Sequence, residues 1–238
     1  MPETEDLANR PWLIGLVACA LHREAIAVRA VLGARGLKWR SVPAGRATES
    51  WTCVTGSDTL AVVVSGPGAE RARQAASFWM PRARQVVVLG AGPSTGLVRP
   101  PAVVLDGDPR LRLRAGQGVP AGVEVLDGRI GHVEAHVHTG YAWESLAAAG
   151  YASVSAQLDP WREAAAAVGG TVLVCHGVHD QVEAPERLVA AAARDDRGWG
   201  QLEALVQPGM RRLREVAAGV TDAAAHCAVA AVLGPARN

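Results

Sequence analysis

The chain has 238 residues, enough for one large α/β domain with a substantial core. Its 24 basic and 23 acidic residues give a formal net charge of +1, which offers no electrostatic argument for a nucleic-acid or acidic-membrane partner. The four cysteines lack CxxC spacing, and the acidic N-terminus lacks the basic region of a secretory signal. No apolar run is expected to reach transmembrane length. These features predict a cytoplasmic protein in a reducing environment.

Strands and helices are predicted to alternate along the chain. The predicted strands are residues 12–19, 37–46, 49–55, 59–65, 85–89, 102–105, 123–125, 131–138 and 171–178. The predicted helices are residues 21–33, 69–80 and 159–168, followed by a mainly helical remainder after the last strand. Residues 90–101 and 106–121 are expected to be loops, and residues 1–10 to be flexible. Without a repeat or a domain boundary, we expect a single α/β domain over residues 1–238.

Two carboxylates follow two of these strands directly. Glu24 lies just after the strand at 12–19, and Asp180 just after the strand at 171–178. Ligands of open α/β sheets bind beyond the carboxyl ends of the strands, so both residues are candidates for one cleft. An alternative for Glu24 is a first-turn acid that the helix dipole favours.

Two glycine-rich segments also follow predicted strands. The first contains Gly66, Gly68 and Arg71 and leads into a helix, where glycines allow close backbone approach and free N–H groups favour an anion. The second contains Gly90, Ala91 and Gly92. Neither matches a dinucleotide-binding or P-loop pattern, so a structural turn is the alternative for each.

The histidines raise the alternative of a metal hydrolase. His132, His136 and His138 alternate along one predicted strand, and two further histidines, His176 and His179, precede Asp180. No HExxH motif or helical histidine pair supports a metal, and strand histidines are often simply hydrogen-bonded. We therefore predict no metal site.

The order of short motifs resembles that of the purine nucleoside phosphorylase / nucleosidase superfamily, and within it the methylthioadenosine/adenosylhomocysteine and hopanoid-associated nucleosidases. The segments that carry the resemblance are Ala18–Glu24, Val64–Ala72, Val87–Leu97, His138–Gly140, Val154–Leu158 and Val178–Asp180. The resemblance implies a nucleoside phosphorylase-like fold with a mixed central sheet flanked by helices. It also implies a small nucleoside-like ligand, no cofactor and a homodimer. Three tryptophans outside the firmest strands, Trp39, Trp51 and Trp143, are expected to be exposed and to support such an interface.

The same resemblance implies hydrolysis of the N-glycosidic bond of a purine nucleoside or a nucleoside-like metabolite, with a biosynthetic role as one setting. Glu24 would deprotonate the attacking water, and Asp180 would protonate or hydrogen-bond the departing base. The implied substrate-binding residues are Gly66, Gly68, Arg71, Gly90, Ala91, Gly92, Gln157 and His179.

The sequence departs from the family pattern at the sugar site. Gln157 stands where the family has the glutamate that binds the ribose hydroxyls, and His179 replaces a serine. A non-catalytic or repurposed member that binds a small molecule is therefore one alternative. A phosphorylase that uses Arg71 for phosphate is another, although residues 86–98 contain no arginine. If the protein still acts on ribosyl bonds, the resemblance predicts that Gln157→Glu raises activity.

Overall fold

A computed structural model describes residues 13–56, 58–117, 119, 122–133, 140–181 and 199–234. Its strands are β1 (Leu13–Cys19), β2 (Trp39–Ser41), β3 (Glu49–Thr55), β4 (Asp58–Val64), β5 (Gln85–Ser94), β6 (Ala102–Gly107), β7 (Glu124–Asp127), β8 (Arg129–His132), β9 (Tyr151–Ser155) and β10 (Thr171–Gln181). Its helices are α1 (His22–Ala34), α2 (Ala69–Trp79), the short 3₁₀ helix η2 (Met80–Arg82), α3 (Pro109–Gly116), α4 (Gly140–Ala148), α5 (Leu158–Ala167) and α7 (Trp199–Leu233).

Within these residues, eight strands form one mixed sheet in the order β2-β3-β4-β1-β5-β10-β6-β7. The four central strands β4, β1, β5 and β10 run parallel. Strand β3 pairs antiparallel with both β2 and β4. Strand β6 pairs antiparallel with β10 and parallel with β7. The prediction that the strands at 12–19, 85–89 and 171–178 share one sheet is therefore confirmed. A separate parallel pair is formed by β8 and β9.

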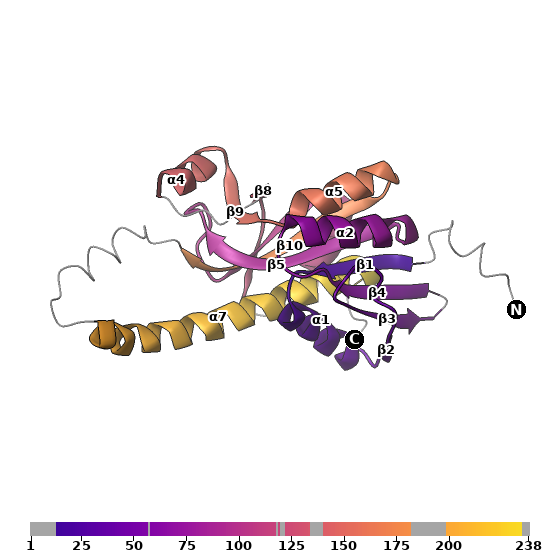
Figure 1. The fold of residues 1–238 in the computed structure, drawn as a ribbon, viewed down its shortest axis with the longest axis horizontal. Coiled ribbons are helices and arrows are strands. Elements are labelled where there is room, and N and C mark those ends of the chain that lie inside the picture. The colour runs from indigo at the N-terminus through magenta and orange to yellow at the C-terminus, as the bar shows by residue number, and fades with distance from the viewer. Residues whose placement is uncertain are drawn as a thin grey trace, which may run out of the picture.

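Helices cover both faces of the large sheet. Helices α1 and α7 lie on one side, while α2 and α5 lie on the other (Figure 1). The two faces carry separate apolar cores, one around Val17, Val87 and Leu173 and the other around Leu16, Val88 and Val174. Consecutive residues of each central strand thus alternate between the two cores, as a strand buried on both faces requires.

Two segments expected to be loops are regular. β5 continues through the glycine-rich stretch to Ser94, because β10 also continues, to Gln181, and supplies hydrogen-bond partners along the whole length. Helix α3 interrupts the second expected loop. It begins after Asp108, whose side chain accepts hydrogen bonds from the N–H groups of Arg110 and Leu111 at 2.9 and 3.1 Å. The Asp-Pro pair at 108–109 is the helix-start signal that could have found it.

Two further expectations need correction. Of the predicted strand at 37–46, only Trp39–Ser41 is a strand. The predicted strand at 131–138 corresponds to β8, which spans Arg129–His132, while residues 134–139, including His136 and His138, lie outside the described residues. The expected flexibility of residues 1–10 likewise concerns residues that are not described.

The expectation that no apolar run reaches transmembrane length is wrong for Glu215–Leu233 of α7. This segment is long and apolar enough to cross a membrane, and 61% of its most apolar window is buried within the protein. It packs against β10 and β5 of the sheet and against α1 and α3. The apolar side chains of this segment therefore form part of the core between α7 and the sheet (Figure 1).

The three tryptophans expected at the surface are not exposed. Trp51 and Trp143 are buried, with 9% and 8% of their surface accessible. Trp39 is half-buried, and the Arg29 guanidinium lies over its ring at 4.0 Å and over the Trp51 ring at 4.8 Å. Cation–π contact and burial account for these residues, so they supply no argument for an interface.

Candidate active site

The carboxyl ends of the four parallel strands meet at one edge of the sheet. Glu24 follows β1 at this edge, and Gly66 follows β4. Asp180 lies near the end of β10, where its backbone pairs with Pro93 of β5. The topology therefore brings together three chain segments that lie far apart in sequence.

The buried Glu24 carboxylate caps the first turn of helix α1. Leu21 occupies the N-cap position and has no side-chain oxygen to cap the helix. Glu24 reaches back instead, and its Oε2 accepts hydrogen bonds from the N–H groups of Ala20 at 2.7 Å and Leu21 at 3.0 Å. Only 2% of the residue is exposed. The carboxylate is thus held rigidly at the strand-to-helix junction.

The Glu24 carboxyl has an unusual proton affinity for a glutamate. Burial raises its pKa from 4.5 to about 7, against the lowering effects of the hydrogen bonds from Leu21 and Ala20 and of the charge of Arg23. A carboxyl group with a pKa near neutrality can both take and return a proton at physiological pH. This is the property that a general acid–base residue needs, and burial at the edge of a sheet provides it.

The turn after β4 is hydrogen-bonded to the end of β1. Ser65 donates from its backbone N–H to the carbonyl of Cys19 at 2.9 Å, and its Oγ donates to the same oxygen at 3.2 Å. Gly66 and Gly68 then adopt φ values of +88° and +94°, which favour glycine. The turn therefore lies directly beside the junction that holds Glu24.

The two glycines of this turn have different surroundings. At Gly66 an added Cβ would lie 2.8 Å from Cδ of Arg71, so the Arg71 side chain occupies the space that was expected to admit a ligand. At Gly68 nothing lies within 4 Å of such a Cβ. The exposed side of the turn is a shallow depression lined by Gly68, Arg71 and neighbouring residues of α2. Of the two glycines, only Gly68 leaves open space for another molecule.

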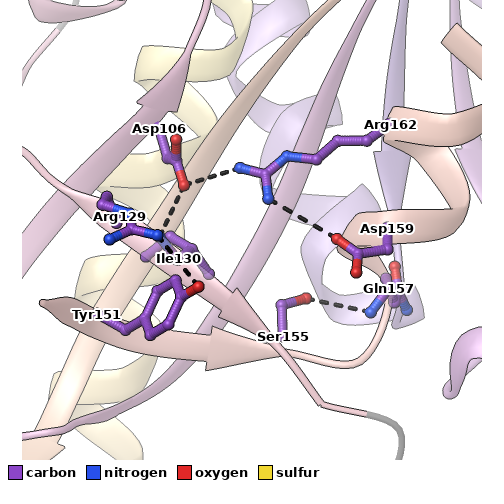
Figure 2. Close-up of polar contacts among 8 residues, drawn as sticks. All are labelled: Asp106, Arg129, Ile130, Tyr151, Ser155, Gln157, Asp159 and Arg162. Atoms are coloured by element: carbon purple, nitrogen blue, oxygen red, sulfur yellow. Dashed lines mark hydrogen bonds and ion pairs between the residues drawn. The ribbon is translucent and has the colours of Figure 1, made fainter. Parts of the chain in front are cut away.

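Gln157 joins this edge from a distant part of the chain. It is the N-cap residue of α5, with 5% of its surface exposed. Its Nε2 donates to the carbonyl of Gly66 at 3.2 Å. Its backbone N–H donates to Oγ of Ser155 at 3.3 Å (Figure 2). Oε1 is buried without a hydrogen-bond partner among the described residues. The structure thus places Gln157 against the same turn that adjoins the Glu24 junction.

The segment Gly90–Gly92 differs from the expected ligand-binding loop. Gly90, Ala91 and Gly92 are strand residues of β5, paired with His176, Gly177 and Val178 of β10. An added Cβ at Gly90 would lie 3.1 Å from Nδ1 of His176, and one at Gly92 would lie 2.9 Å from its Nε2. The His176 imidazole therefore packs against both glycines, and the contact is tightest at Gly92.

His176 is a residue of this region to which the sequence assigned no role at the substrate site. It is 2% exposed, and neither ring nitrogen has a hydrogen-bond partner among the described residues. Burial first, and then the charge of His179, lower its pKa from 6.5 to about 4, so the imidazole is neutral at physiological pH. A histidine in an otherwise apolar strand, opposite two glycines of the neighbouring strand, was the available signal.

A polar network anchors strand β8 and helix α5, whose N-cap residue is Gln157. Oδ2 of Asp106, on β6, accepts from the backbone N–H of Ile130 at 2.7 Å and from Nη2 of Arg162 at 2.8 Å. Figure 2 shows the Arg162 guanidinium reaching Asp106 on one side and Asp159 on the other. Because Ile130 belongs to β8 and Arg162 to α5, one carboxylate ties both elements to the large sheet.

The last two predicted site residues lie where β10 becomes irregular. The pairing register between β10 and β5 shifts between Val178 and Asp180, and His179 lies at this shift, half-buried. The structure describes the backbone of Asp180 but not its side chain. Its convergence with Glu24 therefore stays a prediction. Among the described residues, no three His, Cys, Asp or Glu side chains form a group that could hold a metal.

No protein-family model matches the sequence, and no curated protein resembles it significantly. Solved structures do resemble the fold. The 5′-methylthioadenosine/S-adenosylhomocysteine nucleosidase of Neisseria meningitidis, in complex with methylthio-immucillin-A, is 13% identical with a TM-score of 0.69, over 92% of this chain and 97% of that chain. The futalosine hydrolase of Helicobacter pylori is 12% identical with a TM-score of 0.69, over 92% and 96% of the two chains. The Colwellia psychrerythraea nucleosidase in complex with adenine is 12% identical with a TM-score of 0.69, over 92% and 93%.

At these identities the comparison concerns the fold, and it covers nearly the whole of both chains. The mixed eight-stranded sheet of this chain, flanked by helices, therefore belongs to the same overall fold as these solved structures. The predicted fold class is confirmed: the chain has a nucleoside phosphorylase-like fold.

Proposed function

We propose that the protein is a hydrolase that cleaves the N-glycosidic bond of a purine nucleoside or a nucleoside-like metabolite. The observation that carries the proposal is Glu24, a buried carboxyl with a pKa of about 7 at the carboxyl edge of the central strands. A nucleosidase needs a general base, and solved structures that share the fold include nucleosidases and a futalosine hydrolase.

In the proposed reaction a water molecule attacks the anomeric carbon of the sugar. Glu24 takes a proton from that water as the bond from carbon to the base nitrogen breaks, and Asp180 gives a proton to the departing base. The products are a free base and a free sugar, so no cofactor and no redox step enter the reaction. The transition state has oxocarbenium character, which carboxylates on the two sides of the bond suit.

The decisive experiment measures release of free base in a phosphate-free buffer. The test panel contains adenosine, inosine, guanosine, methylthioadenosine, adenosylhomocysteine and futalosine, analysed by chromatography. Release of base without phosphate from at least one of them, lost in Glu24→Gln, supports the proposal. Release only after addition of phosphate would identify a phosphorylase. No release under either condition, at any enzyme concentration, would contradict cleavage of these substrates.

Gln157 favours a second candidate, a small-molecule binding protein of the same fold without turnover. An amide provides no negative charge at the position where the family pattern has a glutamate. Binding of adenine or of a panel nucleoside without release of base, followed by calorimetry, is the result expected for such a protein.

We propose that the protein is a homodimer and that it is located in the cytoplasm. The dimer rests on the family resemblance alone, because the tryptophans expected to support an interface are not exposed. The proposed cytoplasmic location is supported by four buried cysteines without disulfide partners, Cys19, Cys53, Cys175 and Cys227. Light scattering at micromolar concentration tests the dimer, and a clean monomer mass would contradict it.

A further inference from the structure

A groove of about 460 Å³ lies at the outer edge of the large sheet, where β2, β3 and β4 run side by side (Figure 1). Its lining residues come from these three strands and their ends: Lys38, Trp39, Arg40, Val42, Thr52, Val54 and Thr59. Cys53 and Leu60, which alternate with lining residues, belong to the core of the opposite face. Among the described strands, none pairs with the outer side of β2. The groove therefore adjoins an open strand edge.

The groove combines positive charge with an exposed apolar side chain. Lys38 directly precedes β2 and Arg40 lies within it, and both are exposed. Among the described residues, neither cation forms an ion pair. Val54 of the neighbouring strand β3 has 64% of its surface exposed. An occupant that carries acidic residues beside an apolar one would complement this surface.

The chain enters the sheet beside this groove. Leu13, the first residue of β1, pairs with Thr59 of β4, and Thr59 pairs with Val54 of β3. In the register of β2 on β3, Lys38 lies level with Val54. These four residues form one row across four adjacent strands, about 14 Å long at the usual strand spacing. The segment that precedes Leu13 thus starts at one end of a row that has Lys38 at the other end.

The sequence of this preceding segment complements the groove in charge. The first nine residues carry three acidic side chains and no basic one. The acidic residues are Glu3, Glu5 and Asp6. Asp6 lies seven residues before Leu13, and seven residues of chain can span about 24 Å. This reach exceeds the row of about 14 Å, so the acidic residues are long enough in tether to meet Lys38 and Arg40.

We infer that residues 1–7 bind this groove of their own chain, with their carboxylates on Lys38 and Arg40 and with Leu7 against Val54. Attachment at Leu13 gives the segment a local concentration that a separate acidic peptide lacks. A strand edge with free backbone groups invites pairing with another chain, and an acidic segment laid beside it prevents this. The segment therefore protects the β2 edge of the sheet.

The contact is tested with the full-length protein by zero-length cross-linking. Lys38 is the only lysine of the chain, so a carbodiimide, which joins carboxyl groups to nearby amines, has one side-chain amine to use. Mass spectrometry of the digest should show Lys38 joined to Glu3, Glu5 or Asp6. Lys38→Arg is the control, because it keeps the charge and removes the amine, and this product should disappear. A Lys38 that stays unlinked, or is linked only to carboxylates outside residues 1–7, would overturn the inference.

Isotope mixing identifies which chain supplies the segment. Equal amounts of ¹⁵N-labelled and unlabelled protein are mixed before cross-linking. Linked peptides in which both halves carry the same isotope support binding within one chain. Linked peptides that join a labelled half to an unlabelled half would assign the groove to a second copy and overturn the inference.

The charge pairing is tested through stability. Two full-length variants remove its opposite sides: Lys38→Gln/Arg40→Gln and Glu3→Gln/Glu5→Gln/Asp6→Asn. Each should lower the urea midpoint by about 0.2 M at low salt, and the combined variant should lose no more than either alone. The losses should shrink in about 1 M salt, which screens exposed charges. Additive losses, or losses that persist in salt, would overturn the pairing. Arg110→Gln removes an exposed cation elsewhere and should leave the midpoint unchanged.

Discussion

His176 and Gly92 lie on neighbouring strands, and the imidazole occupies the space that a side chain at position 92 would need. An added Cβ at Gly92 would lie 2.9 Å from Nε2 of His176, and 3.5 Å from Oγ of Ser153. His176 is 2% exposed and has little room to retreat. Position 92 of β5 therefore favours glycine because His176 of the neighbouring strand β10 fills the space beside it.

Substitution of Gly92 by alanine should displace the imidazole. We expect Gly92→Ala to lower the free energy of unfolding by about 1–3 kcal/mol, the usual cost of overpacking a filled core. Chemical denaturation measures the effect. Gly33→Ala is the control, since nothing lies within 4 Å of a Cβ at Gly33 and its helix favours alanine. Equal losses in the two variants would contradict the contact.

Glu24 and His176 should make opposite contributions to stability over the same pH range. The pKa of Glu24 is raised from 4.5 to about 7, so its contribution is present below pH 4.5 and is lost as the pH rises to about 7. The pKa of His176 is lowered from 6.5 to about 4, so its contribution is present above pH 6.5 and is lost as the pH falls to about 4. In the wild type the two trends largely compensate.

Single substitutions should reveal each trend. Relative to the wild type, Glu24→Gln should gain free energy of unfolding, on the order of 3 kcal/mol, as the pH rises from 4.5 to 7. His176→Gln should lose a similar amount over the rise from pH 4 to 6.5. Urea denaturation at several pH values measures both. A difference from the wild type that does not change with pH would show that the group titrates normally.

Catalysis should depend on the ionised form of Glu24. As the general base, Glu24 must be deprotonated, so kcat/KM should rise with pH and level off above an apparent pKa of about 7. Glu24→Gln should lower kcat/KM by about 10²–10⁴-fold. Glu124→Gln removes a carboxylate from an exposed position of β7 and should leave the rate unchanged. If kcat/KM still rises with pH in the same way in Glu24→Gln, a residue other than Glu24 is the general base.

Asp180 should supply the proton that the departing base takes. Asp180→Asn keeps the size of the side chain but removes the acid, so turnover of the native substrate should be abolished. Steady-state assays on the substrate found in the panel provide the measurement. Unchanged turnover in Asp180→Asn would remove Asp180 from the mechanism.

The ion pair between Asp106 and Arg162 should contribute more to the free energy of unfolding than the ion pair between Asp159 and Arg162. Asp106 is 17% exposed and its oxygen lies 2.8 Å from Nη2, whereas Asp159 is 45% exposed with its oxygen at 3.8 Å from Nη1. A double-mutant cycle with Asp106→Asn and Arg162→Gln should give a coupling of roughly 1 kcal/mol, and one with Asp159→Asn nearly none. Similar coupling in both cycles would contradict the difference in burial.

Much of the fold could be predicted from the pattern of residues. Apolar runs followed by polar residues identified β1, β5 and β10, and the helix after β1 matches α1. The glycine-rich stretch at 90–94 was misjudged, because composition alone cannot show that β10 continues beside it and supplies hydrogen bonds. Helix α3 was missed although Asp108 and Pro109 marked its start.

Part of the candidate site could likewise be predicted from the sequence, and part could not. Glu24, Gly66 and Gln157 were proposed from local patterns and the order of motifs, and the structure brings all three to one edge. His176 was not recognised as a neighbour of the glycines, because that contact joins residues of two strands that lie far apart in the chain. The side chain of Asp180 stays a prediction.

By itself the sequence determined the central strands β1, β4, β5 and β10 and the helices α1, α2 and α5 in outline, because local propensity and apolar periodicity belong to neighbouring residues. It also placed Glu24 directly after a strand, whereas Asp180, expected after the strand at 171–178, lies within β10. Only the tertiary structure decided what surrounds those groups. Burial sets the pKa of Glu24 near 7 and that of His176 near 4, and the Gly66 carbonyl orients the amide of Gln157. Desolvation and long-range hydrogen bonds depend on residues far apart in the chain, so no local pattern could specify them.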